Sequence, residues 1–590
     1  MTDQPARPVA GAANAAQPRL EPPTGAVIVR PVAATHAALS GIVAAAAALA
    51  TGELIAGLVP SIPSPLAAVG TALIDYAPPG SKEVVVSLFG TNDKTALLIL
   101  VTASVVVLGA VIGLVARRSY TGAAWLVVAL VGVGALASLR DPTASGPLVV
   151  LAAALQAGAG LQVLAVLLAA ARRAAAARAA AEVEPAETKP AESRDVTPGE
   201  RSPGERSPGE RSPGERASAG APTARRRAAN VARRTFLVRA GVFGALAVVG
   251  GAIGRSVLTG RATASEDAGA AQVSIPPASD PAPSPGMDAS FAIPGITPVI
   301  MPNDQFYRID TALLTPSIDV ASWNLHVFGM VDHEVRLTFD ELVQLPIIER
   351  YVTIACVSNE VGGNLVGNAK WTGPRLADVL EMAGVQAGAT QVVPRSVDGW
   401  TAGFPTSWIT DPAHPRDAMI AIRMNDALLP VEHGFPARLI VPGLYGYVSA
   451  TKWLTEIELT TLEAVDAYWV PRGWAKEAPI LTQSRIDVPR NGSQVAAGPV
   501  AVAGVAWAPD RGVSRVEVRV DDGAWQTATL ATELAPATWV QWKWTWQAAS
   551  GSHVIEVRAT DGTGAVQTDQ VTPPDPDGAR GHHKIAVQVG

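Results

Sequence analysis

The sequence predicts a multi-domain protein with an N-terminal all-α membrane domain, an α+β domain and a C-terminal β-sandwich. The 590 residues are 48% hydrophobic and only 17% charged, with a mean hydropathy of +0.23, which is high for a soluble protein. Long apolar stretches lie before residue 260, mixed helix and strand patterns run over 300–478, and strand patterns alone fill 479–590. Roughly two to four domains are expected at about 150 residues each.

Five apolar stretches are long enough to cross about 30 Å of hydrocarbon as helices. They are 34–59, 94–116, 121–139, 146–170 and 236–258. The first four are closely spaced and nearly free of charge, so four transmembrane helices over 34–170 are predicted rather than buried helices of a soluble core. Residues 1–33 are then a cytoplasmic N-terminus.

Arginine residues orient these helices, because cytoplasmic ends of membrane spans carry an excess of positive charge. With a cytoplasmic N-terminus, Arg140 alone lies on the opposite side. The arginines on the cytoplasmic side are Arg117, Arg118, Arg172, Arg173, Arg178, Arg225, Arg226, Arg227, Arg233 and Arg234. The chain after residue 258 is therefore predicted to be extracytoplasmic, anchored by a multi-pass domain in a bacterial cell membrane.

Two low-complexity segments separate the predicted domains. The first is a disordered cytoplasmic linker over 171–232, in which "TPGERSPGERSPGERSPGER" repeats a five-residue unit four times from Thr197 to Arg216. Proline and glycine in each unit oppose helix and strand, and the alternating charges stay hydrated. The second, rich in proline, alanine and serine, is predicted as an extracytoplasmic linker over 261–299.

The exported part changes its pattern near residue 479. Before it, "LTFDELVQL" and "RLADVLEMAGV" have the spacing of short amphipathic helices, while "RLIVPG" and "LTEIELTTL" have the composition of strands. After it, "VSRVEVRVDDGAWQTATL" alternates valine with charged residues and turns at Asp522-Gly523. Residues 300–478 are therefore predicted to be α+β and 479–590 a β-sandwich.

The chain contains one cysteine, Cys356, in "TIACVSNE". A lone buried cysteine is often an inert, small hydrophobic residue. An exported chain with one cysteine cannot form an internal disulfide, however, and its thiol is open to oxidation unless something occupies it. Cys356 is therefore a candidate metal ligand.

Several ordered blocks resemble the sulfite oxidase family of molybdopterin-dependent oxidoreductases. They are "NDQFYRIDT", "TIACVSNE", "WTGPRLADVLEMAGV" and "MNDALLPVEHGFPARLIVPGLYGYVSATKWLTEIEL", and the resemblance runs from about Asn303 to the C-terminus. It implies a sulfite-oxidase-like molybdopterin domain over 300–478 and an immunoglobulin-like dimerisation domain over 479–590, so a homodimer is expected.

The resemblance also implies a site that holds molybdenum-molybdopterin. Cys356 stands where the family's cysteine sulfur ligates molybdenum, and soft sulfur suits a redox metal. The cofactor-binding residues implied are Tyr307, Arg308, Cys356, Asp378, His433, Arg438, Ser449 and Lys452, and the catalytic residues are Cys356, Arg308 and Arg511. The alternatives for Arg308, Asp378 and Arg511 are a surface arginine, a solvated helix residue and a β-turn arginine, in that order.

Three positions depart from the family's pattern. The segment "VSNEV" replaces one that ends in paired arginines, so Glu360 stands where a cation is expected. Pro471 is the best match to the family's active-site tyrosine, with Tyr468 three residues earlier, and Ile309-Asp310 replaces an asparagine-histidine pair. The cofactor site is thus better supported than a sulfite site.

The sequence also constrains the partners. It has no Cys-x-x-Cys-His motif, one cysteine cannot hold an iron–sulfur cluster, and the predicted spans contain only His36 and no methionine, so neither haem nor an iron–sulfur cluster is expected. Electrons would then pass to or from a separate partner or a quinone. A net charge of -6 without a long basic stripe argues against nucleic acid.

"RRTFL" in the segment 233–260, which holds the fifth predicted span, resembles a twin-arginine export signal in an internal position. The family resemblance implies that molybdopterin is inserted in the cytoplasm, so the domain must fold before it crosses the membrane. The twin-arginine route carries folded proteins, which explains the motif. The alternative is that Arg233 and Arg234 only fix the orientation of the span.

The predicted function is a membrane-anchored molybdopterin oxidoreductase that performs two-electron oxygen-atom transfer, in which the metal supplies the redox chemistry. Sulfite, a small oxyanion, is the leading substrate. A sulfoxide reductase of the same superfamily is the alternative enzyme, and a cofactor-free extracytoplasmic binding module is the alternative from another class.

Overall fold

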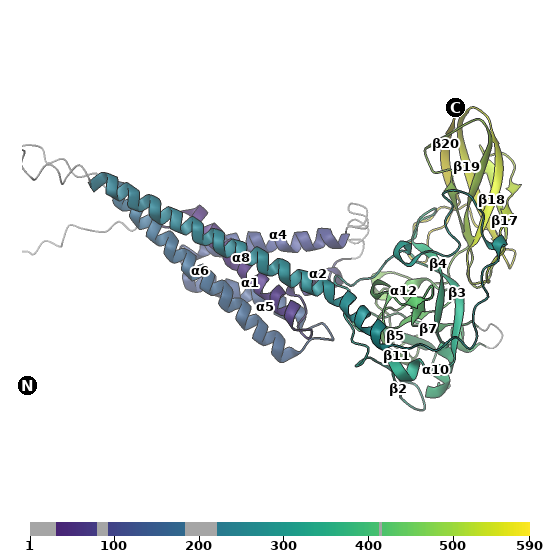
Figure 1. The fold of residues 1–590 in the computed structure, drawn as a ribbon, viewed down its shortest axis with the longest axis horizontal. Helices are drawn as coiled ribbons and strands as arrows, with labels where there is room; N and C mark the ends of the chain where they lie inside the picture. Colours follow the sequence, from purple (N-terminus) through teal and green to yellow (C-terminus); the bar gives the residue numbers. More distant parts are fainter. Residues whose placement is uncertain (1–30, 79–92, 183–220, 412–415) are drawn as a thin grey trace, which may run out of the picture.

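The computed structural model describes residues 31–78, 93–182, 221–411 and 416–590. An elongated bundle of helices meets an α+β domain end-on, and a β-sandwich lies beyond that domain (Figure 1). The helical, α+β and β-sandwich parts follow the chain in the predicted order. Most of the predicted cytoplasmic N-terminus, 1–33, and the PGER repeats lie outside the described residues.

The helical region packs around its first helix. Its elements are α1 (Ala34–Leu58), α2 (Pro65–Asp75), α4 (Asp93–Ala116), α5 (Tyr120–Ser138), α6 (Gly146–Glu182) and α8 (Ala221–Gln272). In the described residues, five helices, all but α2, are long and apolar enough to cross a membrane. Glycines let α1 approach α4 closely: a Cβ on Gly41 would lie 2.0 Å from the Gly109 carbonyl oxygen.

Both predicted linkers are shorter than expected, because helices extend into them. Residues 171–182 are alanine, arginine and one glutamate, which favour helix, so α6 continues to Glu182. Helix α8 begins at Ala221 and continues to Gln272, and the first proline after its predicted end is Pro276. At about 1.5 Å per residue, its 52 residues reach well beyond the roughly 30 Å of a hydrocarbon core.

The end of α8 and the chain after it are fastened to the α+β domain. The carboxylate of Glu266 accepts a hydrogen bond of 2.9 Å from the backbone N–H of Val431, and Ala262 belongs to the domain's core. Further on, Asp280 binds Arg350 at 2.5 Å and Arg375 at 2.9 Å. Residues 261–299 therefore connect the helical region to the domain through defined contacts.

The α+β domain is built on two mixed or antiparallel sheets and a strand pair. The first sheet is β2 (Val335–Thr338), β1 (Asn324–Gly329), β11 (Leu454–Thr460), β5 (Gln391–Ser396) and β6 (Phe404–Pro405), in that order. The second is β3 (Ile347–Ala355), β4 (Val366–Pro374), β8 (Arg423–Met424) and β9 (Ala427–Leu428), and the pair is β10 (Arg438–Ile440) with β7 (Met419–Ala421). Strands β1 and β11 run parallel, with His326 opposite Glu456.

Short helices connect these strands and cover the first sheet. They are α9 (Phe339–Leu342), α10 (Leu376–Ala383), α11 (Ser407–Thr410) and α12 (Gly446–Ser449), with 3-10 turns η2 (Met287–Ala289), η3 (Asn303–Gln305), η4 (Val431–His433) and η5 (Val470–Arg472). Leu325 and Ile457 of the sheet and Leu376 of α10 are fully buried in one apolar core. The "RLADVLEMAGV" helix is confirmed as α10, and "LTFDELVQL" forms only the single turn α9.

The C-terminal β-sandwich has two sheets. One is β12 (Gln483–Val488), β14 (Gly498–Trp507), β18 (Val540–Ala548) and β17 (Thr529–Leu530). The other is β13 (Ser493–Val495), β20 (His583–Val589), β19 (Gly551–Asp561), β15 (Val513–Val520) and β16 (Gln526–Thr527). Val516 and Val518 are buried between the sheets. The backbone N–H of Trp539 donates to the Thr353 hydroxyl of β3 at 2.8 Å, which ties the sandwich to the α+β domain.

Candidate active site

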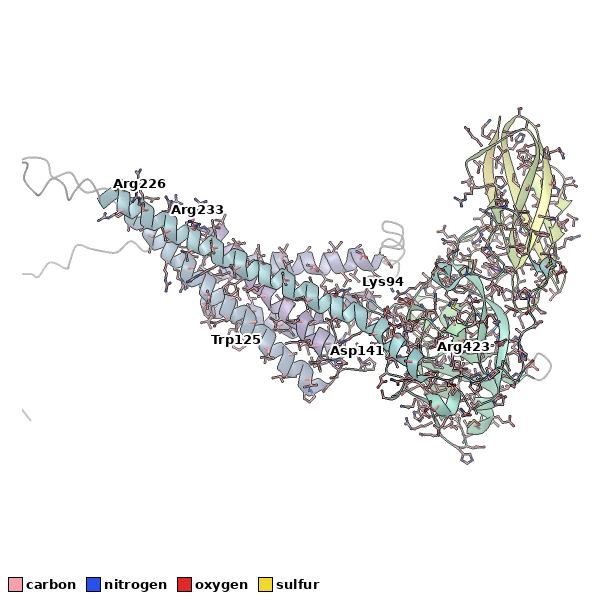
Figure 2. All side chains as sticks on the ribbon, in the orientation of Figure 1. Lys94, Trp125, Asp141, Arg226, Arg233 and Arg423 are labelled. Atoms are coloured by element: carbon pink, nitrogen blue, oxygen red, sulfur yellow. The ribbon has the colours of Figure 1, made fainter. Side chains whose placement is uncertain are left out.

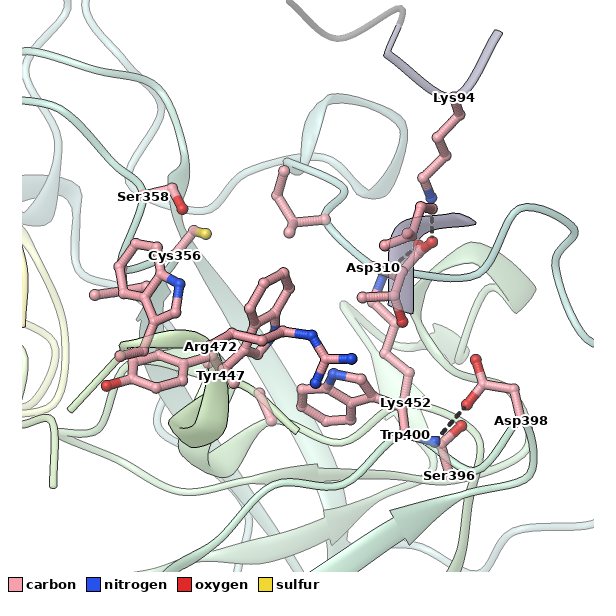
Figure 3. Close-up of a pocket in the computed structure, with 18 of the residues that line it drawn as sticks. Lys94, Asp310, Cys356, Ser358, Ser396, Asp398, Trp400, Tyr447, Lys452 and Arg472 are labelled. Atoms are coloured by element: carbon pink, nitrogen blue, oxygen red, sulfur yellow. Dashed lines mark hydrogen bonds and ion pairs between the residues drawn. The ribbon is translucent and has the colours of Figure 1, made fainter. Parts of the chain in front are cut away.

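A cavity of about 570 Å³ lies where the α+β domain meets the end of the helical region. Cys356, Arg438 and Lys452 line it from the α+β domain, and Asp75 and Lys94 line it from the helical region. Figure 3 shows the sulfur of Cys356 on one side of this space and Lys94, Asp310 and Lys452 on the other. The cavity thus contains the single cysteine and both of the cations that the sequence predicts for a phosphate.

Cys356 is placed by the end of strand β3. The strand is buried along most of its length and ends at Ala355, so the next side chain enters the cavity. The backbone N–H of Cys356 donates to the Leu365 carbonyl at 2.9 Å, and the residue is 8% exposed. Its sulfur is therefore held in position while the remaining access is from the cavity.

Arg438 is a buried cation whose described partners are neutral. Its two terminal nitrogens donate to the carbonyl oxygens of His433 at 3.0 Å and Ala450 at 3.3 Å, while its Nε is buried without a partner. The guanidinium lies 5.0 Å from the centre of the Trp371 ring. Burial lowers the pKa of Arg438 to about 10. A desolvated guanidinium with an unused donor fits an anionic group that a bound cofactor would bring.

Lys452 is paired, in contrast to Arg438. Its ammonium lies 3.1 Å from the Asp310 carboxylate and donates to the Glu432 carbonyl at 2.9 Å. Burial lowers the pKa of Lys452 to about 8, more than the nearby Asp310 carboxylate raises it. Burial alone would raise the pKa of Asp310, but Lys452, Lys94 and Arg308 hold it well below its ordinary value. Asp310 thus carries a negative charge into the cavity.

His433, Tyr307 and Ser449 have distinct roles around this cavity. Burial, Lys452 and Arg438 lower the pKa of His433 to about 4, so its ring is neutral near pH 7; one ring nitrogen lies 3.0 Å from the Asn303 carbonyl and the other is buried without a partner. Tyr307 lines the cavity, and burial raises its pKa. The Ser449 hydroxyl, at the end of α12, donates at 3.0 Å to the carbonyl of Tyr445, the residue before that helix.

Five sequence-predicted residues are absent from the described lining of the cavity: His433 and Ser449, whose contacts are given above, and Arg308, Asp378 and Arg511. Arg308 binds Asp310 at 3.1 Å and Thr315 at 2.8 Å, and its side chain is 38% exposed. Asp378 lies in the first turn of α10, which packs on the first sheet. Arg511 binds Asp561 at 3.0 Å and the Ile480 carbonyl at 2.9 Å. Arg308 and Arg511 are thus each paired with an acid of the protein, and Asp378 lies on a helix outside the cavity.

The structure adds lining residues that sequence reasoning did not select. Arg472 extends into the cavity from "YWVPRGW", the block that departs from the family's tyrosine pattern (Figure 3). Trp400, Trp469 and Trp474 also line it. Asp75 lies between the first two predicted spans and Lys94 begins the second, and no pattern in the sequence connects either residue to a site.

These residues fit molybdenum-molybdopterin. Cys356 would hold the metal through sulfur, and Arg438 and Lys452 would hold the phosphate, with Tyr307 on the same wall. The unpartnered buried Nε of Arg438 supports this assignment, because buried polar atoms in native proteins normally have partners.

Comparisons with known proteins identify two domains in this part of the chain. A family described as "Oxidoreductase molybdopterin binding domain" matches residues 312–469, and "Bacterial Ig domain" matches 483–557. The mitochondrial sulfite oxidase of Homo sapiens is 30% identical over 322 residues, which are 46% of this chain and 58% of that protein's length. The solved sulfane dehydrogenase SoxCD from Paracoccus pantotrophus has 22% identity and a TM-score of 0.43, covering 50% of this chain and 82% of that one.

A further relative is covered over most of its own length. The uncharacterized oxidoreductase YuiH of Bacillus subtilis (strain 168) is 35% identical over 156 residues, which are 26% of this chain and 74% of YuiH. That coverage, the matched molybdopterin-binding domain and the similarity to sulfite oxidases point to one family. The chain belongs to the sulfite oxidase family of molybdopterin-dependent oxidoreductases.

Proposed function

We propose that this protein performs two-electron oxygen-atom transfer at molybdenum bound to Cys356. The observation that carries the proposal is that Cys356 and Arg438 line the same cavity. The hydrogen bonds of the Arg438 guanidinium go to carbonyl oxygens and not to a carboxylate. The bound cofactor supplies the electron and oxygen chemistry. Cys356 fixes the metal end, Arg438 and Lys452 fix the phosphate end, and tryptophans on the walls limit the access of water.

The substrate class follows from the charged residues that line the cavity containing Cys356, which is called the chamber below. Among the described residues its lining holds four carboxylates and four cations: Asp75, Asp93, Asp310 and Asp398, and Lys94, Arg438, Lys452 and Arg472. A cofactor phosphate, with a charge of about −1.5 to −2, uses the positive charge of Arg438 and Lys452. No surplus of positive charge then remains for a dianion such as sulfite.

This balance favours the sulfoxide reductase alternative over sulfite oxidation, which led on sequence grounds. A sulfoxide is neutral and presents one strong acceptor oxygen, so a paired arginine suffices to bind it. The test is turnover of the purified holoenzyme with sulfite and an artificial electron acceptor, and with sulfoxides and an artificial donor. Faster sulfoxide reduction supports this proposal, and efficient sulfite oxidation without sulfoxide turnover contradicts it.

The helical region supports a membrane location with the site outside. Figure 2 shows Arg226 and Arg233 at the end of the bundle far from the α+β domain, and Lys94 and Asp141 at the near end. The rings of His36 and Phe236 lie 4.4 Å apart, which places the start of α1 beside the arginine-rich part of α8. Positive charge on the far end matches a cytoplasmic side there and an extracytoplasmic site at the other.

Two partner predictions accompany this proposal. Electrons are exchanged with a separate protein or a quinone, since neither haem nor an iron–sulfur cluster is expected from the sequence. A homodimer through the β-sandwich is the second. Sedimentation of the detergent-solubilised protein tests the homodimer. An optical spectrum of the holoenzyme tests whether the protein carries haem or an iron–sulfur cluster of its own.

A further inference from the structure

The catalytic chamber is closed on one side by the helical region. Leu73, Ile74 and Leu97 contribute apolar surface there, and Asp75 and Lys94 contribute charge. The α+β domain holds this wall in place: Lys94 donates to the Ala312 carbonyl at 2.8 Å and binds Asp310. The end of the helical bundle therefore forms one wall of the chamber.

Asp75 and Arg472 form the second ion pair across this boundary. An Asp75 carboxylate oxygen lies 3.3 Å from Nη2 of Arg472 and accepts a hydrogen bond of 2.8 Å from the Tyr468 hydroxyl. The guanidinium carbon of Arg472 lies 3.7 Å from the centre of the Tyr468 ring. Asp75, Arg472 and Tyr468 thus hold one another in a single arrangement at the chamber wall.

Asp75 is placed against the preference of its own helix. It is the last residue of α2, where the helix dipole puts partial negative charge and a carboxylate is unfavourable. Arg472 and Tyr468 compensate for this from the α+β domain. The helix α2 itself therefore does not favour an acid at this position. Its contacts with Arg472 and Tyr468 at the chamber do.

We propose that Asp75 is a specificity-determining positioning residue of the active site. It neutralises Arg472 while orienting that guanidinium, so the chamber accepts neutral sulfur oxides that carry an apolar body and discriminates against oxyanions. Leu73, Ile74 and Leu97, which line the chamber together with the tryptophans, receive the apolar body. This inference rests on the proposed oxygen-transfer function and gives the helical region a part in substrate choice.

The test removes the negative charge of Asp75 and keeps its shape. In the purified full-length holoenzyme, Asp75→Asn leaves the positive charge of Arg472 uncompensated, so sulfate, a probe that needs no turnover, binds about tenfold more tightly by calorimetry. The KM for methyl phenyl sulfoxide does not fall by more than about twofold in the same variant, because a neutral substrate gains little from net charge. Asp75→Glu retains the sulfate affinity of the unaltered protein.

A matched control lies between the α+β domain and the β-sandwich, where Arg416 of the first pairs with Asp510 of the second. Arg416 binds Asp510 at 2.8 Å and its guanidinium carbon lies 4.0 Å from the centre of the Trp408 ring, and neither charged residue lines the chamber. Asp510→Asn therefore leaves sulfate binding unchanged. An equal gain in sulfate affinity in Asp510→Asn and Asp75→Asn overturns the proposal, as does an unchanged affinity in Asp75→Asn.

Arg472→Gln tests the same pair from the other side, and it keeps the proposal testable if Asp75→Asn does not fold. Loss of the cation weakens sulfate binding and lowers kcat/KM for the sulfoxide by about tenfold to a hundredfold, the range for one charge-assisted hydrogen bond. Unchanged values for both overturn the proposal. A holoenzyme that turns over no sulfur oxide contradicts the oxygen-transfer function, while the sulfate titrations still decide the role of Asp75.

Discussion

The ammonium nitrogen of Lys452 lies 3.1 Å from the carboxylate of Asp310, and both side chains line the cavity that contains Cys356. The pair has different partners from Arg438, which is buried among neutral groups. A phosphate that binds here therefore meets one cation already compensated and one that is not. Arg438 should accordingly contribute more to cofactor retention than Lys452.

The pH dependence of stability should reflect the burial of Lys452. Its pKa falls from 10.5 to about 8 on folding, so between these values the unfolded chain binds more protons than the folded one. The free energy of unfolding of the cofactor-free protein therefore rises with pH across this window, by up to about 3 kcal/mol from this residue. Thermal unfolding from about pH 7 to about pH 11, a range that spans both pKa values, measures it. Lys452→Met should lack this rise; the same slope in both proteins would contradict the assignment.

Arg438→Gln should release the cofactor. The substitution removes a buried cation whose charge-assisted hydrogen bonds to a phosphate are worth roughly 1.5–3 kcal/mol each, so retention of pterin should fall by about tenfold to a hundredfold. Pterin fluorescence per chain after gel filtration measures this. Arg558→Gln is the control, because Arg558 lies 4.2 Å from the centre of the Trp525 ring in the β-sandwich, away from the cavity. Equal retention in both variants would exclude Arg438 as the phosphate ligand.

Cys356→Ser should separate the metal from the pterin. Serine keeps the shape of the side chain but replaces the soft sulfur ligand, while Arg438 and Lys452 still hold the phosphate. Molybdenum per chain should fall from about one to well below that, with pterin largely retained and oxygen-transfer activity lost. Elemental analysis and pterin fluorescence on the same sample measure the two. Full activity with a normal molybdenum content would refute the central assignment.

Export should require the arginine pair Arg233 and Arg234 at the far end of α8. Replacing both by lysine keeps the positive charge that orients the helix and removes the arginine pair that the export signal needs. The α+β domain should then fail to cross the membrane, while the four preceding helices insert normally. Protease accessibility in cells measures both. Normal export of the lysine variant in a strain without the twin-arginine machinery would leave the pair a topological signal only.

The sequence by itself determined the order of the parts, and of the eight cofactor-binding residues that it predicted, four line the cavity: Tyr307, Cys356, Arg438 and Lys452. Apolar runs of transmembrane length, period-two valines in 513–520 and the spacing of "HGFPAR" before Lys452 are local patterns, and local patterns survive in a single sequence. The apolar runs and the alternating valines located the five long helices and the β-sandwich, and the family resemblance selected Cys356, Arg438 and Lys452, which line the cavity. The linkers were predicted too long, because helix propensity continued past the apolar segments of α6 and α8.

Only the tertiary structure decided which charges face one another. Arg308 and Arg511 have the residue type that an anion site needs, yet each binds an acid of the protein, Asp310 and Asp561, through contacts that no spacing encodes. Asp75 and Arg472 are 397 residues apart, and the end-on packing of the bundle brings them within 3.3 Å. The net charge of a chamber depends on all of its walls, and here one wall comes from a different domain, so substrate choice was outside the reach of the sequence.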